Sequence, residues 1–176
     1  MITAGRKLLR DEIEQVWTID RSEVIDSIYH LRNGALVLTP EHHNVGGWPA
    51  GEAEKYTPIL LECFDRGGWF YGEFDRATLV GVVALDNKRI GKHRDQLQLE
   101  FLHVSSAYRN RGMGAKLFRL ARATARERGA ARLYISATPS ENTVNFYLRL
   151  GCKITCEPDP ELFEREPEDI HLECDV

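Results

Sequence analysis

Apolar residues recur with helical spacing over the first thirty or so positions of the chain. Residues 10–20 carry apolar side chains three and four positions apart, and residues 22–31 do the same after a serine suited to cap a helix. The apolar positions are Ile13, Val16 and Trp17 in the first stretch and Val24, Ile25, Ile28 and Leu31 in the second. The pattern predicts two helices, the second of which ends at Asn33–Gly34.

The next part of the chain mixes strand, loop and helix signals. A short apolar run at residues 35–39 predicts a strand, and the residues 40–50 predict a Gly- and Pro-broken loop that holds Trp48. Residues 51–68 predict a short helix stopped by two glycines.

From residue 69 onward the apolar period changes to two, which is typical of strands. Residues 69–75 and 78–86 predict an antiparallel hairpin joined at Arg76–Ala77. Residues 96–105 show the clearest alternation, with Leu97, Leu99, Phe101 and His103 on one face and Gln98, Glu100 and Leu102 on the other. Glu100 is therefore expected to share a strand face with Leu102, and His103 to pack on the opposite face.

The remaining segments alternate between helix and strand. Residues 113–129 predict a helix with one apolar stripe that ends at Gly129, and residues 131–138 predict a strand. A short helix is predicted over residues 140–151 and a last strand over 170–174. The fold class predicted is α+β: a mixed sheet with helices on its faces, built as a single domain over residues 1–176.

Composition and charge narrow the function classes. The chain of 176 residues is 43% hydrophobic and 28% charged, as in ordinary globular proteins, and its net charge is −4. Residues 109–128 carry seven Arg or Lys and one Glu, whereas residues 157–175 carry nine Asp or Glu and one Arg. An acidic chain argues against a nucleic-acid partner, and a local basic segment favours a small anionic ligand. The basic residues could also form the solvated face of a helix.

Location and metal binding can be judged from the same sequence. No apolar run approaches the roughly 20 residues that span a bilayer, and the first fifteen residues lack the apolar region of a signal peptide, so we expect a cytoplasmic protein without a membrane partner. Four scattered cysteines then predict reduced thiols. Cys152, Cys156 and six histidines leave a metal site open, but the chain has neither a CxxC pair nor HExxH, so we expect no metal.

The stretch YRNRGMGAKL, residues 108–117, places glycines and arginines between a predicted strand and a predicted helix. The first amides of a helix have no intrahelical partner, and glycine lets an anion approach them closely, so Gly112 and Gly114 predict a phosphate cradle to which Arg109 and Arg111 add charge. The P-loop motif is absent, and Leu117 stands where the dinucleotide fingerprint needs its third glycine. An ordinary turn before an amphipathic helix is the alternative.

Residues 79–152 resemble the GNAT superfamily of N-acetyltransferases. Leu102–Val104 at a strand end, followed by Arg109-Asn110-Arg111-Gly112-Met113-Gly114, resembles the family signature [RQ]-x-x-G-x-[GA]. A strand and helix with Tyr147 and Gly151 resemble the next motif, although Cys152 replaces the usual Phe and Ser140 stands where Asn is commonest. The resemblance implies a central, mostly antiparallel mixed sheet that is splayed between two neighbouring strands and flanked by helices.

The resemblance also implies a cosubstrate, acetyl-CoA, bound between the splayed strands. The diphosphate would lie on the amides of residues 109–115, and the main chain of residues 102–104 would hold the pantetheine and aim the acetyl carbonyl. The implied cofactor-binding residues are Leu102, His103, Val104, Arg109, Asn110, Arg111, Gly112, Met113, Gly114, Ala115, Ser140 and Asn142. Ser140 and Asn142 could instead cap the helix that begins there.

Acetyl transfer to an amine requires a base, an oxyanion donor and an acid. Tyr147 is the candidate acid for the leaving thiolate, with a core tyrosine as the alternative. Glu100 is the candidate base, because an apolar strand would raise its pKa, although a solvent-facing carboxylate would fit the same pattern. His103 is a rival base. A main-chain N–H near Leu102 or His103 would stabilise the oxyanion.

The acceptor is expected to be a small-molecule amine or a protein amino group. Pocket residues are expected around residues 17–48 and 70–75, an aromatic and acidic set suited to a cationic amine such as an antibiotic or polyamine: Trp17, Asp20, Glu23, Trp48, Tyr71 and Glu73. Ordinary core packing with a solvated surface would suit the same residues equally. The sequence thus predicts an N-acetyltransferase, with a non-catalytic module that binds acyl-CoA as the alternative. A homodimer is left open.

Overall fold

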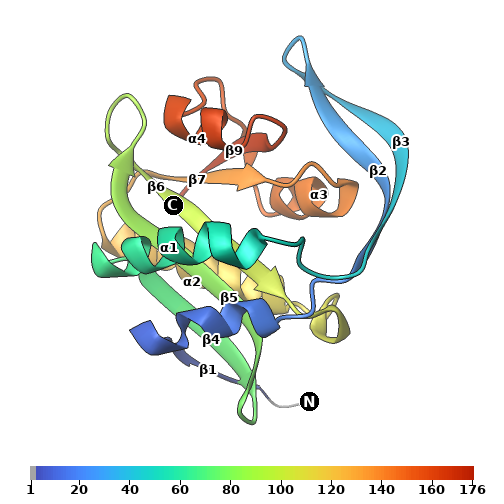
Figure 1. Cartoon of the computed structure of the whole chain (residues 1–176). Coiled ribbons are helices and arrows are strands. Elements are labelled where there is room, and N and C mark those ends of the chain that lie inside the picture. The colour runs from blue at the N-terminus through green and yellow to red at the C-terminus, as the bar shows by residue number, and fades with distance from the viewer. Residues whose placement is uncertain (1–2) are drawn as a thin grey trace.

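The computed structural model describes residues 3–176 and contains one large sheet (Figure 1). Its strands have the order β1-β4-β5-β6-β7-β9-β8, and every neighbouring pair is antiparallel except β6 and β7. The strands are β1 (Ala4–Lys7), β4 (Trp69–Asp75), β5 (Thr78–Ile90), β6 (Gln96–Val104), β7 (Arg132–Ala137), β8 (Lys153–Ile154) and β9 (Ile170–Asp175). The mostly antiparallel mixed sheet predicted from the sequence is confirmed.

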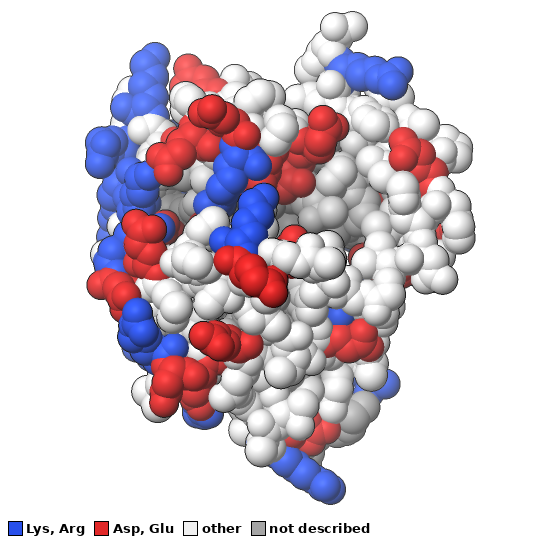
Figure 2. Space-filling model, in the orientation of Figure 1, with Lys and Arg blue, Asp and Glu red and all other residues white. Residues whose placement is uncertain are grey.

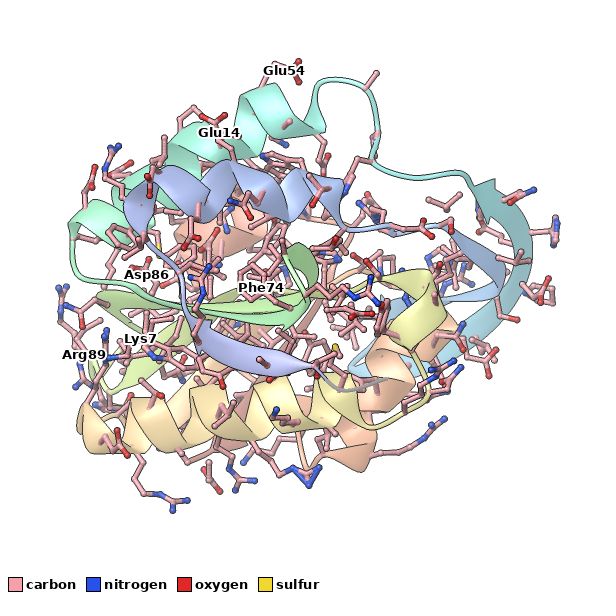
Figure 3. All side chains as sticks on the ribbon, turned by 90° about the horizontal axis from the view of Figure 1, so that it is seen from below. Lys7, Glu14, Glu54, Phe74, Asp86 and Arg89 are labelled. Carbon is pink, nitrogen blue, oxygen red and sulfur yellow. The ribbon has the colours of Figure 1, made fainter. Side chains whose placement is uncertain are left out.

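Helices cover both faces of this sheet, as Figure 3 shows from below. The 3-10 helix η1 (Arg10–Thr18) and helix α1 (Glu52–Asp65) pack on one face, and α2 (Met113–Glu127) packs on the other. Helix α3 (Glu141–Arg149) extends the α2 side, and α4 (Pro160–Arg165) precedes β9. We call the two cores the α1-side core, which includes Ile13, Leu60, Phe70 and Val82, and the α2-side core, which includes Leu85, Leu97, Leu117 and Leu133.

The prediction of a helix at residues 22–31 is wrong, because this segment is strand β2 (Glu23–Arg32). It pairs with β3 (Ala35–Val45) in a two-stranded sheet that extends away from the body (Figure 1). Asn33 and Gly34 both have positive φ angles and join Arg32 to Ala35 as a two-residue hairpin turn, instead of ending a helix. Consequently β3 continues to Val45 through the first half of the predicted loop.

A β-bulge changes the direction of the side chains in β6. Leu99 lies opposite Leu85 and Phe101 lies opposite Ala84, so Glu100 is an extra residue without a partner of its own. The alternation therefore shifts: Leu99, Leu102 and Val104 contribute to the α2-side core, whereas Phe101 packs with the α1-side core. The prediction that Phe101 shares a face with Leu97 and Leu99 is wrong for this reason.

Within residues 3–176, no helix combines the length and apolar character needed to cross a bilayer.

Candidate functional site

Strands β6 and β7 run side by side only at their beginnings. Residues 96–98 pair with residues 132–134, and no further pairing joins the two strands within residues 3–176. Beyond this point β7 continues against β9, while β6 continues against β5 alone. One side of the main chain of residues 99–104 is therefore left without a strand partner, and an extended ligand with amide groups can take that place.

The N-terminus of α2 lies directly after this open strand. Its first intrahelical hydrogen bond is donated by the Lys116 amide to the Gly112 carbonyl, and the amides of residues 110–115 donate to no acceptor within residues 3–176. Asn110 and Gly112 both have positive φ angles, which turns successive amides toward a common centre. A cavity of about 240 Å³ opens beside this turn, lined in part by Arg111, Gly112, Met113 and Lys116. Such an array of free amides at a helix N-terminus suits a phosphate.

The two glycines of this turn have different roles. A Cβ at Gly112 would meet no atom within 4 Å, so this backbone is open to a ligand. A Cβ at Gly114 would lie 3.2 Å from the Phe146 ring and 3.9 Å from Val104. The missing side chain of Gly114 lets α2 approach α3 and β6, and a contact of its amide with phosphate stays a prediction.

The two arginines also differ. The Arg109 guanidinium donates hydrogen bonds to the carbonyls of Val104 (2.8 Å), Ser22 (2.9 Å) and Asp20 (3.3 Å), so it fixes the loop before β2 against the end of β6. Arg111 is exposed, and its guanidinium takes part in no hydrogen bond or ion pair within the described part of the chain. We therefore expect Arg111, and not the side chain of Arg109, to face the phosphates.

This difference leads to a prediction for a pair of variants. Arg109→Gln is expected to lower the free energy of unfolding by about 1–3 kcal/mol, because the partly buried carbonyls of Val104 and Ser22 lose a charged donor. Arg111→Gln is expected to leave that free energy unchanged and to weaken acetyl-CoA binding about tenfold. Urea titration and calorimetric titration measure the two effects. If Arg109→Gln instead weakened acetyl-CoA binding without lowering the free energy of unfolding, Arg109 would be the arginine that faces the phosphates.

Glu100 lies at the bulge, just beyond the last residue pair between β6 and β7. Its side chain is only 2% exposed. Oε1 lies 3.2 Å from Nη2 of Arg165, and Oε2 is buried without a hydrogen-bond partner within residues 3–176. Burial raises the pKa of Glu100 to about 7, although Arg165 acts in the opposite direction. A carboxyl with this pKa can accept a proton near neutral pH.

His103 lies on the same side of the sheet as Phe101. Its ring centroid is 4.5 Å from that of Phe101 and 4.8 Å from that of Trp48. Burial, together with the charges of Arg21 and Arg109, lowers the pKa of His103 to about 3. The imidazole therefore stays neutral and is a weak base, which favours Glu100. Because both Glu100 and His103 face the α1 side while Leu102 faces the α2 side, the predicted grouping of Glu100 with Leu102 is wrong.

Tyr147 lies in α3 and belongs to the α2-side core. It is 6% exposed and packs edge-to-face against Phe118 and Phe146, with centroid distances of 5.8 and 5.0 Å. The same core contains Val104 of β6 and Ala137 of β7, which lie beyond the residues through which these two strands pair. Burial raises the pKa of the Tyr147 phenol, which keeps it protonated at neutral pH. Its hydroxyl makes no hydrogen bond within residues 3–176.

Ser140 and Asn142 begin α3. The Ser140 hydroxyl caps the helix by accepting a hydrogen bond from the Thr143 amide (3.3 Å), and the residue is buried. Asn142 is exposed and donates a hydrogen bond to Glu23 of β2 (3.2 Å). Ser140 thus has the capping role, and a contact of Asn142 with the cosubstrate stays a prediction.

The predicted acceptor set is divided between the two faces of the sheet. Trp17 and Trp48 pack together with a centroid distance of 4.8 Å, and both contact Phe101 on the α1 side. Tyr71 packs with the α2-side core, and Glu73 is bound there by Lys116 at 2.5 Å. Glu73 and Tyr71 therefore do not join the aromatic group, and the prediction of one pocket from all six residues is wrong.

Sequence reasoning missed several residues near Glu100. Arg165 and Glu166 come from the end of α4, and Tyr56 of α1 donates a hydrogen bond to Glu166 (3.0 Å). The acidic composition of residues 157–175 was the available signal. It could not show which of these residues reach β6, because no strand or helix had been predicted between residues 152 and 169.

Comparisons with known proteins concern the family and the fold of the chain. A model of the acetyltransferase (GNAT) family matches residues 26–152. None of the curated proteins matches the chain significantly. Among solved structures, a nourseothricin acetyltransferase has a TM-score of 0.71 at 18% identity, with 99% of each chain covered. The PaiA N-acetyltransferase from Thermoplasma acidophilum, in complex with coenzyme A, has a TM-score of 0.66 at 17% identity, with 100% of each chain covered. A GNAT-family acetyltransferase from Staphylococcus aureus has a TM-score of 0.70 at 16% identity, with 99% of each chain covered.

Proposed function

Because the chain belongs to the acetyltransferase (GNAT) family, we propose that it transfers the acetyl group of acetyl-CoA to a primary amine by direct attack. The observation that carries this proposal is Glu100: a buried carboxyl with one free oxygen, placed where β6 and β7 separate. A module that only binds acyl-CoA has no need for a carboxyl with a pKa near 7 at this point.

Binding of acetyl-CoA would use the main chain. The diphosphate would accept hydrogen bonds from the free amides of residues 110–115, with Arg111 beside them. The pantetheine would follow the unpaired edge of β6 at residues 102 and 103, since the Val104 carbonyl already accepts a hydrogen bond from Arg109. The structural neighbour that contains coenzyme A supports this choice of cosubstrate.

The reaction can be written with these groups. The acceptor nitrogen attacks the thioester carbon while Glu100 accepts its proton, directly or through one water. A main-chain N–H near Leu102 or His103 stabilises the oxyanion of the tetrahedral intermediate. The C–S bond then breaks, the carbonyl forms again, and Tyr147 protonates the departing thiolate. The products are an N-acetylated amine and coenzyme A.

The acceptor would lie on the α1 side of the sheet. The aromatic group of Trp17, Trp48 and Phe101 forms one wall there, and the acidic end of α4 forms another. Figure 2 shows this face of the molecule hollowed between the body and the β2–β3 hairpin, with acidic side chains at the rim. Aromatic faces and carboxylates attract cations, so we propose a cationic small-molecule amine. Nourseothricin, named for one structural neighbour, is a candidate to include among test acceptors.

The proposal is tested by measuring thiol release from acetyl-CoA with a panel of amines. The panel combines cationic antibiotics, polyamines and a lysine peptide. We expect release that depends on the acceptor, together with a mass increase of one acetyl group on that acceptor. Tight binding of acetyl-CoA without acetylation of any amine would instead support the non-catalytic acyl-CoA-binding module.

Tyr147→Phe is expected to lower kcat about 100-fold, because the thiolate must leave without a proton donor. The core position should tolerate phenylalanine, so acetyl-CoA affinity should change little. Tyr29→Phe is the matched control, since it removes the hydroxyl of another tyrosine beside this core, which donates a hydrogen bond to Asn145 of α3. Equal kcat values for the two variants would remove Tyr147 from the mechanism.

A further inference from the structure

Arg165 is the one cation in direct contact with Glu100 within residues 3–176. It is the last residue of α4, and it comes from a segment beyond the family match at residues 26–152. Its Nη2 lies 3.2 Å from Glu100 Oε1, and its Nε lies 3.8 Å from Glu166 Oε1. The Arg165 side chain is 23% exposed while that of Glu100 is 2% exposed. The contact is therefore largely shielded from water, which strengthens it.

Helix α4 is held firmly enough to present Arg165 in one place. Asp159 caps its N-terminus by accepting hydrogen bonds from the Glu161 and Leu162 amides. Leu162 is buried against Ile90 and Tyr134. At the other end, Tyr56 of α1 donates a hydrogen bond to Glu166, the residue after Arg165. Helix α4 thus connects α1 to the strands around the site.

The two carboxyl oxygens of Glu100 have different surroundings. Oε1 is held by Arg165, whereas Oε2 is buried and has no partner among the described residues. A buried carboxylate oxygen without a donor is costly unless a ligand or water completes it. Under the proposed function, the missing donor is the acceptor amine or a water that it displaces.

We propose that Arg165 is a positioning residue for acetyl transfer: it anchors Oε1 of Glu100 and so directs Oε2 toward the acceptor nitrogen. The inference rests on the proposed function, because it assumes that Glu100 is the base. It adds a residue from outside the family motifs, which neither the signature at residues 109–114 nor the second motif contains.

The charged groups around Glu100 determine in which direction its pKa changes when Arg165 is lost. Arg165 and Arg66 favour its ionised form, while Asp86 and Glu166 oppose it, and Cys63 of α1 also faces it. Arg66 is already paired with Asp86 through two hydrogen bonds of 2.7 and 2.6 Å, so its charge is largely balanced. Loss of Arg165 therefore raises the pKa of Glu100 further, and a smaller fraction of the enzyme is active at neutral pH.

The test is the pH dependence of kcat/KM for Arg165→Gln, Arg165→Lys and a control. In Arg165→Gln, the acid limb of this profile, over which kcat/KM rises with pH, should move to higher pH by about 1–3 units. Activity lost at neutral pH should therefore return in alkaline solution. Arg165→Lys keeps the charge and should keep the limb near its original position, with a lower kcat. Lys88→Gln is the matched control, because it removes another ion pair of α4, with Glu161 at 2.6 Å, and should leave the profile unchanged.

Three results would overturn the proposal. A uniform loss of activity at all pH values in Arg165→Gln would mean that Arg165 only supports the fold. Measurements of acetyl-CoA affinity and circular dichroism would then show the loss of folded structure independently. If Glu100→Gln is inactive but the acid limb of the Arg165→Gln profile does not move, Arg165 has no positioning role and Glu100 remains the base. An acid limb that persists in Glu100→Gln would remove Glu100 as the base, and the proposed mechanism would fail together with the role of Arg165.

Discussion

Glu100→Gln is expected to lower kcat by about 100- to 10,000-fold while acetyl-CoA still binds with its original affinity. Glutamine has nearly the same shape, and it can still accept a hydrogen bond from Arg165. It cannot accept the proton of the attacking amine. The loss should therefore fall on turnover with little change in binding, because the proposed diphosphate site at residues 110–115 is separate from Glu100.

The pH profile of the native enzyme supplies the second part of this prediction. Burial raises the pKa of Glu100 from 4.5 to about 7, so the ionised, proton-accepting form increases as the pH rises through 7 and is complete only well above it. The rate should follow the same course. Burial also raises the pKa of Asp169 to about 7, so the limb is assigned to Glu100 only if it disappears in Glu100→Gln.

Glu173→Gln is the control for this experiment. Glu173 is also a buried carboxylate with an arginine partner, Arg132, at 3.1 Å, but it lies where β9 pairs with β7. We expect its replacement to affect stability without removing the acid limb. Full activity in Glu100→Gln, or an equal loss of activity in both variants, would contradict the role given to Glu100.

Gly112→Val is expected to weaken acetyl-CoA binding by about 100-fold or more. The new side chain would project into the open space beside the free amides, where it would block the diphosphate and remove at least two hydrogen bonds to a charged group. A side chain at a positive φ angle is also strained, so the free energy of unfolding should fall by about 1–2 kcal/mol. Calorimetric titration and urea unfolding measure the two effects.

The chain offers a closely matched control at the start of α1. Gly51 precedes that helix with φ 82° and ψ −4°, against 82° and −2° for Gly112, and a Cβ would meet no atom within 4 Å at either position. Gly51→Val should therefore show the same loss of stability with no loss of acetyl-CoA affinity. If both variants bind acetyl-CoA equally well, the N-terminus of α2 is not the diphosphate site.

Much of the central sheet and the open N-terminus of α2 could be predicted from the sequence. The alternation in residues 69–104 reflects a sheet covered on both faces, and the order strand, glycine turn, helix around Gly112 is a local feature with local causes. The segment at residues 22–31 was mispredicted because its apolar spacing fits a helix as well as a strand. Its Asn-Gly turn and its β-branched and aromatic residues were the better signal.

The arrangement around Glu100 could not be predicted, because it depends on contacts between distant parts of the chain. The bulge arises from the register of β6 against β5, and this shifts Phe101 and His103 to the face opposite that of Leu97 and Leu99. The Arg165 contact joins residues 65 positions apart. Periodicity assumes an unbroken strand, so it could place neither Glu100 nor its partner.

The central proposal is that the amides at the start of α2 bind the diphosphate of acetyl-CoA. A crystal structure of the acetyl-CoA complex tests it directly. We predict diphosphate oxygens about 3 Å from amide nitrogens of residues 110–115, with the pantetheine along β6 at Leu102 and His103. A diphosphate bound elsewhere, with these amides left free, would contradict the claim.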